Sequence, residues 1–174
     1  MMVPRRLLMV LVVAIAALLQ VSIVQRIEFG DASPDLLVLV IVALALMTNS
    51  VDGAVAGFSA GMLVSLFAAL PLGPHALMGT VIGYFAGRWG EALVTDEHPL
   101  PPLIAGVLAT LTMQIGRPVL EFIVEPASSL QGMWSAALIV TVVNGILAIP
   151  VYVAVRRTLL FAAAPSGFAS AGEA

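Results

Sequence analysis

Long apolar blocks separated by short polar segments occupy almost the whole chain, and this pattern restricts the fold more than any other feature. Hydrophobic residues make up 61% of the 174 positions and charged residues 10%, whereas soluble domains carry roughly 25% charged residues. The chain has too few polar side chains to cover a water-exposed surface, so lipid is the expected solvent. Lipid offers no hydrogen-bond partners, and uninterrupted blocks of this length satisfy their own backbone as helices. The sequence predicts an all-α, polytopic membrane protein.

Six blocks are candidates for transmembrane helices: 7–24, 36–47, 53–70, 75–89, 103–124 and 133–155. The first block contains Ala14-Ile15-Ala16, which resembles a signal-peptide cleavage site, but the apolar run continues beyond it and we expect a retained span. The second block is the weakest, since on length alone about a dozen residues suit a re-entrant segment. We expect one six-helix transmembrane domain over residues 1–161 and a disordered cytoplasmic tail over residues 162–174.

The distribution of arginine predicts the orientation in the membrane. With six spans, one side of the membrane holds five of the seven basic residues and the other holds two: Arg5, Arg6, Arg88, Arg156 and Arg157 against Arg26 and Arg117. Positive charge is enriched on the cytoplasmic side, so both termini are expected in the cytoplasm. Omitting the second block would export the arginine pair at the C-terminus, so six spans fit better than five. The net charge of −3 and the scattered arginines give no nucleic-acid-binding face.

Small residues recur at every fourth position in the third and fourth blocks. The two stripes are Gly53, Gly57, Gly61 and Ser65 in the third block and Gly79, Gly83 and Gly87 in the fourth. Such stripes let helix backbones approach closely inside a membrane. We favour packing of these two helices against each other, and a docking groove for a partner helix is the alternative interpretation.

The fifth block carries a polar stripe near its end. Gln114, Arg117, Glu121 and Glu125 are spaced by three, four and four residues and fall on one helical face. Charged groups at membrane depth often mark a path for a substrate or an ion. We favour a salt bridge between Arg117 and Glu121 that reaches the headgroups at the outer end of the span. Pro118 predicts a kink at this level.

Two further polar residues suggest structural roles. Asn144 lies in the middle of the sixth block, where a buried amide without a partner is costly, so we expect it to bond another helix. Asp35 follows Pro34 at the start of the second block and is expected to cap a helix N-terminus.

No residue pattern typical of catalysis or metal binding occurs in the sequence. The chain has no Cys, which excludes a thiolate nucleophile and a disulfide framework. Asp96, Glu97 and His98 are consecutive, which does not match the spacing of metal ligands. The remaining histidine, His75, has no nearby residue that would form a nucleophile–base pair with it. We expect no cofactor and no enzymatic activity.

Several motifs in the second to fourth blocks match a known family pattern. They are Pro34-Asp35-Leu36-Leu37, Gly57-Phe58-Ser59-Ala60-Gly61-Met62-Leu63, Pro71-Leu72-Gly73-Pro74-His75-Ala76-Leu77 and Gly83-Tyr84. In these motifs, in its size and in its six-block layout, the chain resembles the bacterial rod shape-determining protein MreD family. The family usually has Asp where this chain has Ser65, so the resemblance gives no charge-dependent role to that position.

The resemblance implies a non-enzymatic scaffold subunit of the cell-elongation machinery, which synthesises peptidoglycan, in the cell inner membrane. Its implied partner is the single-span protein MreC, with the actin-like MreB filament and peptidoglycan synthases contacted indirectly. The implied fold is similar to that of the substrate-binding subunits of energy-coupling-factor vitamin transporters. A small-molecule transporter subunit remains the alternative hypothesis, with Gln114, Arg117, Glu121 and Asn144 as its candidate polar contacts.

Overall fold

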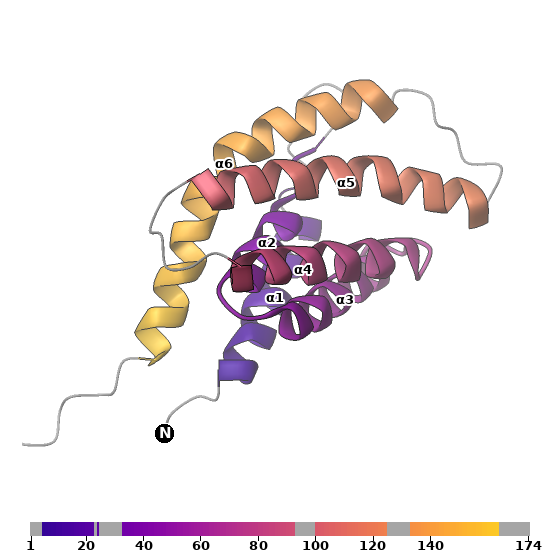
Figure 1. Cartoon of the computed structure of the whole chain (residues 1–174). Helices are drawn as coiled ribbons and strands as arrows, with labels where there is room; N and C mark the ends of the chain where they lie inside the picture. The colour runs from indigo at the N-terminus through magenta and orange to yellow at the C-terminus, as the bar shows by residue number, and fades with distance from the viewer. Residues whose placement is uncertain (1–4, 23, 25–32, 93–99, 125–132, 164–174) are drawn as a thin grey trace, which may run out of the picture.

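The computed structural model describes residues 5–22, 24, 33–92, 100–124 and 133–163, and over these ranges the chain forms six α-helices (Figure 1). They are α1 (Arg5–Ser22), α2 (Leu36–Leu46), α3 (Ser50–Phe67), α4 (Pro74–Ala92), α5 (Leu100–Val124) and α6 (Met133–Ala163). The all-α prediction is confirmed. Positions 164–174 of the predicted tail lie outside the described residues, as do Arg26, Asp96, Glu97, His98 and Glu125.

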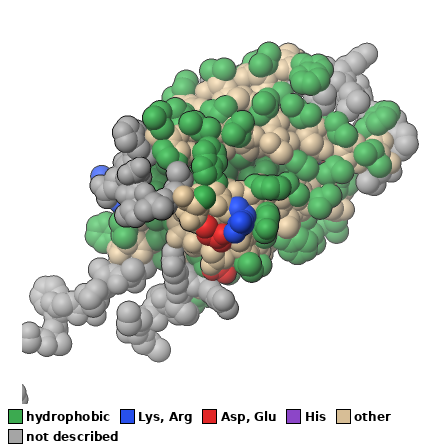
Figure 2. All heavy atoms as spheres, in the orientation of Figure 1, with side chains coloured by type: hydrophobic (Ala, Val, Ile, Leu, Met, Phe, Trp, Pro, Cys, Tyr) green, Lys and Arg blue, Asp and Glu red, His purple; other side chains and the backbone are tan. Residues whose placement is uncertain are grey.

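The surface of the described helices suits lipid. Segments Ser50–Phe67, Leu100–Ile123 and Ala137–Phe161 are long and apolar enough to cross a membrane, whereas the apolar segments of α1 and α2 are shorter. Large hydrophobic side chains such as Val55, Phe85 and Ile146 are exposed. Figure 2 shows hydrophobic side chains spread over the visible face, with charged side chains confined to small areas. Apolar exposure on this scale marks a surface that a bilayer covers.

Helix α2 lies at the centre of the bundle although it is the shortest helix. Its 11 residues span about 16 Å, roughly half of the 30 Å hydrocarbon core. Every residue from Leu37 to Ala45 is buried, because each of the other five helices packs against α2. A helix enclosed in this way needs no polar face, which explains its uninterrupted apolar sequence. The block that looked weakest as a span therefore forms the core.

Helices α3 and α4 form an antiparallel hairpin (Figure 1). Asn49 caps α3 by accepting a bond from the Asp52 amide at 2.8 Å. The opposite end of the hairpin turns through Ala69 and Gly73, which both have positive φ angles of 51° and 128°. Glu91 near the end of α4 accepts two bonds from Ser50, from its amide at 2.7 Å and its hydroxyl at 2.9 Å. These contacts lock the first turn of α3 to the last turn of α4.

Helix α6 is longer than its apolar block predicts. The prediction ended the sixth block at Val155, before Arg156-Arg157, but α6 continues as a helix to Ala163. The correction has a physical cause, because Val155 and Leu159 pack into the core on both sides of the arginine pair and hold this segment helical. Figure 1 shows α6 changing direction along its length, and α1 begins on the side where α6 ends.

Each of the two longest helices contains a proline. Pro118 lies inside α5 and Pro150 inside α6, and each removes one backbone donor from its helix. Helix α5 nevertheless runs unbroken through Pro118 from Leu100 to Val124.

Candidate functional site

The two glycine stripes face each other across the α3–α4 hairpin. Gly53 opposes Gly83, Gly57 opposes Gly79, and Gly61 opposes the backbone of His75. A methyl group added to Gly57 would overlap the carbonyl of Gly79, and one added to Gly83 would overlap the carbonyl of Gly53.

The interface continues to the cytoplasmic end predicted for the hairpin. A methyl group on Gly87 would lie 2.6 Å from the Asn49 carbonyl oxygen. Ser65, at the other end of the α3 stripe, is 1% exposed, and its hydroxyl has no hydrogen-bond partner within the described part of the chain. The glycines of each stripe therefore pack against the backbone of the opposite helix and do not line an open groove.

The predicted polar face of α5 meets the first turn of α4. The Nε atom of Arg117 lies 3.6 Å from Oε1 of Glu121, and its Nη1 atom lies 3.3 Å from Nε2 of His75. Because the guanidinium has only donors, Nε2 of His75 can take part in this contact only as the acceptor, in the tautomer with the ring proton on Nδ1. Gln114 lies one turn before Arg117 and is half-buried.

Sequence reasoning missed the contact between His75 and Arg117. It took His75 as the first residue of the fourth block and gave it no partner, and the structure places it in the first turn of α4, where it is 6% exposed. Its partner is 42 residues away in sequence. A histidine that directly follows a proline at the start of an apolar block was the available signal, because proline favours the first position of a helix.

Asn144 joins three parts of the fold. Its Nδ2 donates to Oγ1 of Thr110 in α5 and to the carbonyl oxygen of Asp35, both at 3.0 Å, and its Oδ1 accepts from the Asp35 amide at 3.1 Å. The expected bond to another helix is therefore present. The side chain is fully buried, and both N–H donors and the amide oxygen are used within the protein.

The start of α2 is held by side chains from three segments. Asp35 accepts from the Val38 amide at 3.2 Å, which is the predicted cap. Gln20 of α1 accepts from the Leu36 amide at 2.8 Å and donates to the Pro34 carbonyl oxygen at 3.0 Å. Gln20 is 6% exposed, and sequence analysis did not single it out. A lone Gln inside an apolar block was the signal, because such a side chain needs a polar partner.

Three of the other family-motif residues lie on α3 or in the turn before α4, and the fourth precedes α2. Phe58 is 51% exposed on α3, Pro71 and Gly73 lie exposed in the turn before α4, and Pro34 is buried beside α2. These positions are separated in the fold and do not form one cavity.

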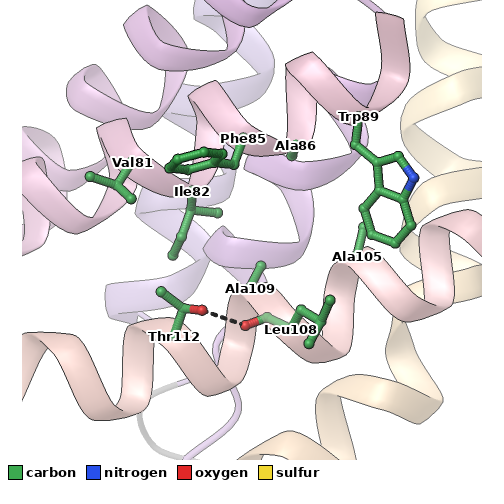
Figure 3. Close-up of a pocket in the computed structure, with 9 residues that line it drawn as sticks. All are labelled: Val81, Ile82, Phe85, Ala86, Trp89, Ala105, Leu108, Ala109 and Thr112. Atoms are coloured by element: carbon green, nitrogen blue, oxygen red, sulfur yellow. Dashed lines mark hydrogen bonds between the residues drawn. The ribbon is translucent and has the colours of Figure 1, made fainter. Parts of the chain in front are cut away.

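Two grooves open on the apolar surface. One, of about 340 Å³, lies between α4 and α5 over a floor that includes Ala86, Ala105 and Ala109 (Figure 3). Its hydroxyl group, Oγ1 of Thr112, donates to the Leu108 carbonyl oxygen at 2.8 Å. The second groove, of about 350 Å³, lies between α1 and α3. The groove between α4 and α5 suits apolar groups such as lipid chains or helix side chains, whereas Asp52 and Ser59 also line the groove between α1 and α3.

Within the described residues, no group of three or more His, Cys, Asp or Glu side chains is placed to hold a metal ion. The geometry instead joins helices to one another, through backbone contact in the α3–α4 pair and through amide side chains around α2.

Comparison with known proteins gave one family match. The model of the family described as rod shape-determining protein MreD matches residues 2–159. No curated protein and no solved structure matched the chain.

Proposed function

Because the chain belongs to the MreD family of rod shape-determining proteins, we propose that it is a non-enzymatic membrane scaffold of the bacterial cell-elongation machinery. The observation that carries this proposal is the family match over residues 2–159 of 174. The chain is thus a rod shape-determining membrane protein, and the proposal adds how it acts. It acts by holding other membrane proteins of the machinery rather than by chemistry of its own.

The arrangement of polar side chains supports a scaffold. The buried amides of Gln20 and Asn144 are bonded to the backbone at the start of α2, so they serve the fold. Asn144 was one of the four candidate polar contacts for a transported substrate, and its donors and acceptor are taken by Asp35 and Thr110. A binding cavity needs polar groups left free to meet a ligand. The transporter alternative therefore has less support than the scaffold.

The proposed partner is a single-span, MreC-like protein of the cell inner membrane, with the peptidoglycan synthases and the actin-like MreB filament reached through it. The exposed apolar helix faces and the two surface grooves provide surface for a partner helix. The proposed topology has six spans with both termini in the cytoplasm, on the basis of the arginine distribution. Similarity to the vitamin-transporter subunits remains a prediction.

The role of the glycine stripes is proposed to be packing of the α3–α4 hairpin. Backbone contact along Gly53, Gly57, Gly79 and Gly83 gains dispersion energy that substitutes for the hydrophobic effect, which does not drive association in lipid. The contact between Arg117, His75 and Glu121 is proposed to tie α5 to this hairpin near the outer membrane surface.

Depletion and complementation test the scaffold proposal. Depleting the protein should turn rod-shaped cells round, and affinity purification in mild detergent should recover the MreC-like partner. Single Ala variants of His75, His98, Arg117 and Glu121 should each restore rod shape, because a scaffold does not depend on one titratable group, whereas loss of a general base or a nucleophile costs orders of magnitude in rate. A variant that inserts and binds its partner normally but leaves cells round would refute the scaffold and point to an active or transport site.

A further inference from the structure

The last turns of α6 carry charged and apolar side chains in an order that a simple span does not explain. Helix α6 continues for six residues beyond Arg157, to Ala163. Leu159 in this stretch is buried against the bundle at 7% exposure, but Leu160 and Phe161 are 56% and 81% exposed. Large apolar side chains thus follow the arginine pair and are exposed in the described part of the structure.

If α6 left the membrane perpendicular to its plane, the exposed apolar side chains after Arg157 would lie in water. At 1.5 Å per residue, Phe161 would lie about 6 Å farther into the water than Arg157. If the arginine were at the headgroups, the exposed phenyl ring would then be in water. A helix that runs along the membrane surface removes this conflict, because an arginine reaches the headgroups while neighbouring apolar groups stay at the acyl boundary.

The bend in α6 allows this direction. Pro150 lacks the N–H that would bond the carbonyl of Ile146 and its ring crowds that turn, so the helix is free to bend there. Figure 1 shows α6 changing direction between its orange first part and its yellow last part. Val155 and Leu159, at 6% and 7% exposure, fix the last part against the core. Its orientation is therefore set by packing and not by the direction of the preceding span.

We propose that the part of α6 after Pro150 is an interfacial helix that binds anionic phospholipids of the surrounding bilayer. The exposed Arg157 pairs with lipid phosphate, which guanidinium groups bind through two parallel hydrogen bonds. Leu160 and Phe161 insert between the headgroups and the acyl chains. Charge complementarity with a negatively charged leaflet favours a lipid over another apolar partner for this surface. The proposal does not depend on the scaffold function.

Depth measurements on the full-length protein in vesicles test this proposal. The chain has no Cys, so a nitroxide is attached singly through Phe161→Cys, or through Ile146→Cys as a reference for the membrane interior. Ile146 is 73% exposed on the preceding part of α6. Collision with oxygen and with a water-soluble nickel complex reports the depth of each label in phosphatidylcholine vesicles with and without phosphatidylglycerol. The label at 161 should lie at the headgroup–acyl boundary. When phosphatidylglycerol is present, its collisions with oxygen should increase and its collisions with the nickel complex should decrease.

Charge variants in the same background separate lipid binding from simple insertion. Arg157→Glu should shift the label at 161 toward the collision values of free label in water, whereas Arg157→Lys should keep most of the depth. As a control for insertion, the label at 146 must remain deep in the membrane in every variant. If Arg157→Glu fails this control, Arg157→Gln replaces it. A water-like label at 161 in both lipid mixtures, no response to charge reversal, or burial only after the MreC-like partner is added would each overturn the proposal.

Discussion

At the scale of single residues, the fold depends on positions where a hydrogen atom or an amide group cannot be replaced. Gly57 and Gly83 are needed for space, since their Cα hydrogens face backbone carbonyls of the opposite helix. Asn144 is needed for its hydrogen bonds, since its amide group serves both Asp35 and Thr110. The two kinds of position predict different responses to mutation.

Replacing Gly83 by Ala should destabilise the protein by about 1–3 kcal/mol, the usual cost of overpacking a close contact. The cost arises because the new methyl group overlaps the Gly53 carbonyl. Gly145→Ala is the matched control, since its methyl group meets only Val107 Cγ2 at 3.4 Å, and Ala is a better helix former by up to about 1 kcal/mol. Thermal unfolding midpoints in detergent measure both effects. Equal midpoints for the two variants would contradict the role assigned to the stripe.

Replacing Asn144 by Leu should also lower the unfolding midpoint. The change leaves the backbone amide and carbonyl of Asp35 without their partner, and a buried polar group left unpaired costs about 1–3 kcal/mol. Ile146→Leu, on the lipid-exposed side of the same helix, is the control and should leave the midpoint unchanged. If both variants unfold at the same temperature, the Asn144 bonds do not stabilise the fold.

At the scale of elements, six apolar blocks correctly predicted six helices, because lipid leaves the backbone few alternatives. The helix ends were predicted less well. The charge of Arg156-Arg157 indicated an end to α6, but the buried faces of Val155 and Leu159 continue the helix. The central position of α2 could not be predicted, since its sequence does not reveal that five other helices enclose it.

The candidate site could be predicted only where its signal was local. Spacing along one helix predicted the stripes of small residues and the pairing of Arg117 with Glu121. The approach of His75 to Arg117 depends on how α4 packs beside α5, which no spacing within a single helix encodes. Gln20 was missed for the same reason, because its partners belong to the next segment of the chain.

Removing the Gln20 amide should loosen the start of α2. Gln20→Met leaves the Leu36 amide and the Pro34 carbonyl without their partner, while the Asp35 cap on Val38 remains. Hydrogen exchange measured by mass spectrometry should become faster in a peptide that covers the start of α2 and stay unchanged in α3. Leu18→Met, on the lipid side of α1, should change neither. Unchanged exchange at the start of α2 would show that Gln20 is dispensable there.

At the scale of the whole molecule, the protein is a bundle whose centre is apolar and whose described surface is largely apolar too. Water-facing regions are therefore restricted to the ends of the bundle, and the arginine distribution predicts which end faces the cytoplasm. The start of α1 and the end of α6 lie on one side of the molecule (Figure 1), and the six-span topology stays a prediction.

Cysteine labelling tests this topology against a chain that has no Cys of its own. A Cys at Asp96, between α4 and α5, should react with an impermeant maleimide only after the cells are permeabilised. A Cys at Ser128, between α5 and α6, should react in intact cells. The reverse result would invert the orientation, and reaction of both in intact cells would rule out six spans.

The enclosed position of α2 has a consequence for how the protein is made. A segment of 11 residues is too short to be released by the insertion machinery as an independent span. Its first amides are bonded by Gln20, which is synthesised before it, and its Asp35 cap is bonded by Asn144, which is synthesised 109 residues after Asp35. Because α2 packs against α6, it cannot reach its final, fully enclosed position until α6 has been synthesised. Biogenesis is completed by α6, and truncation before Asn144 should leave a chain that membrane proteases remove.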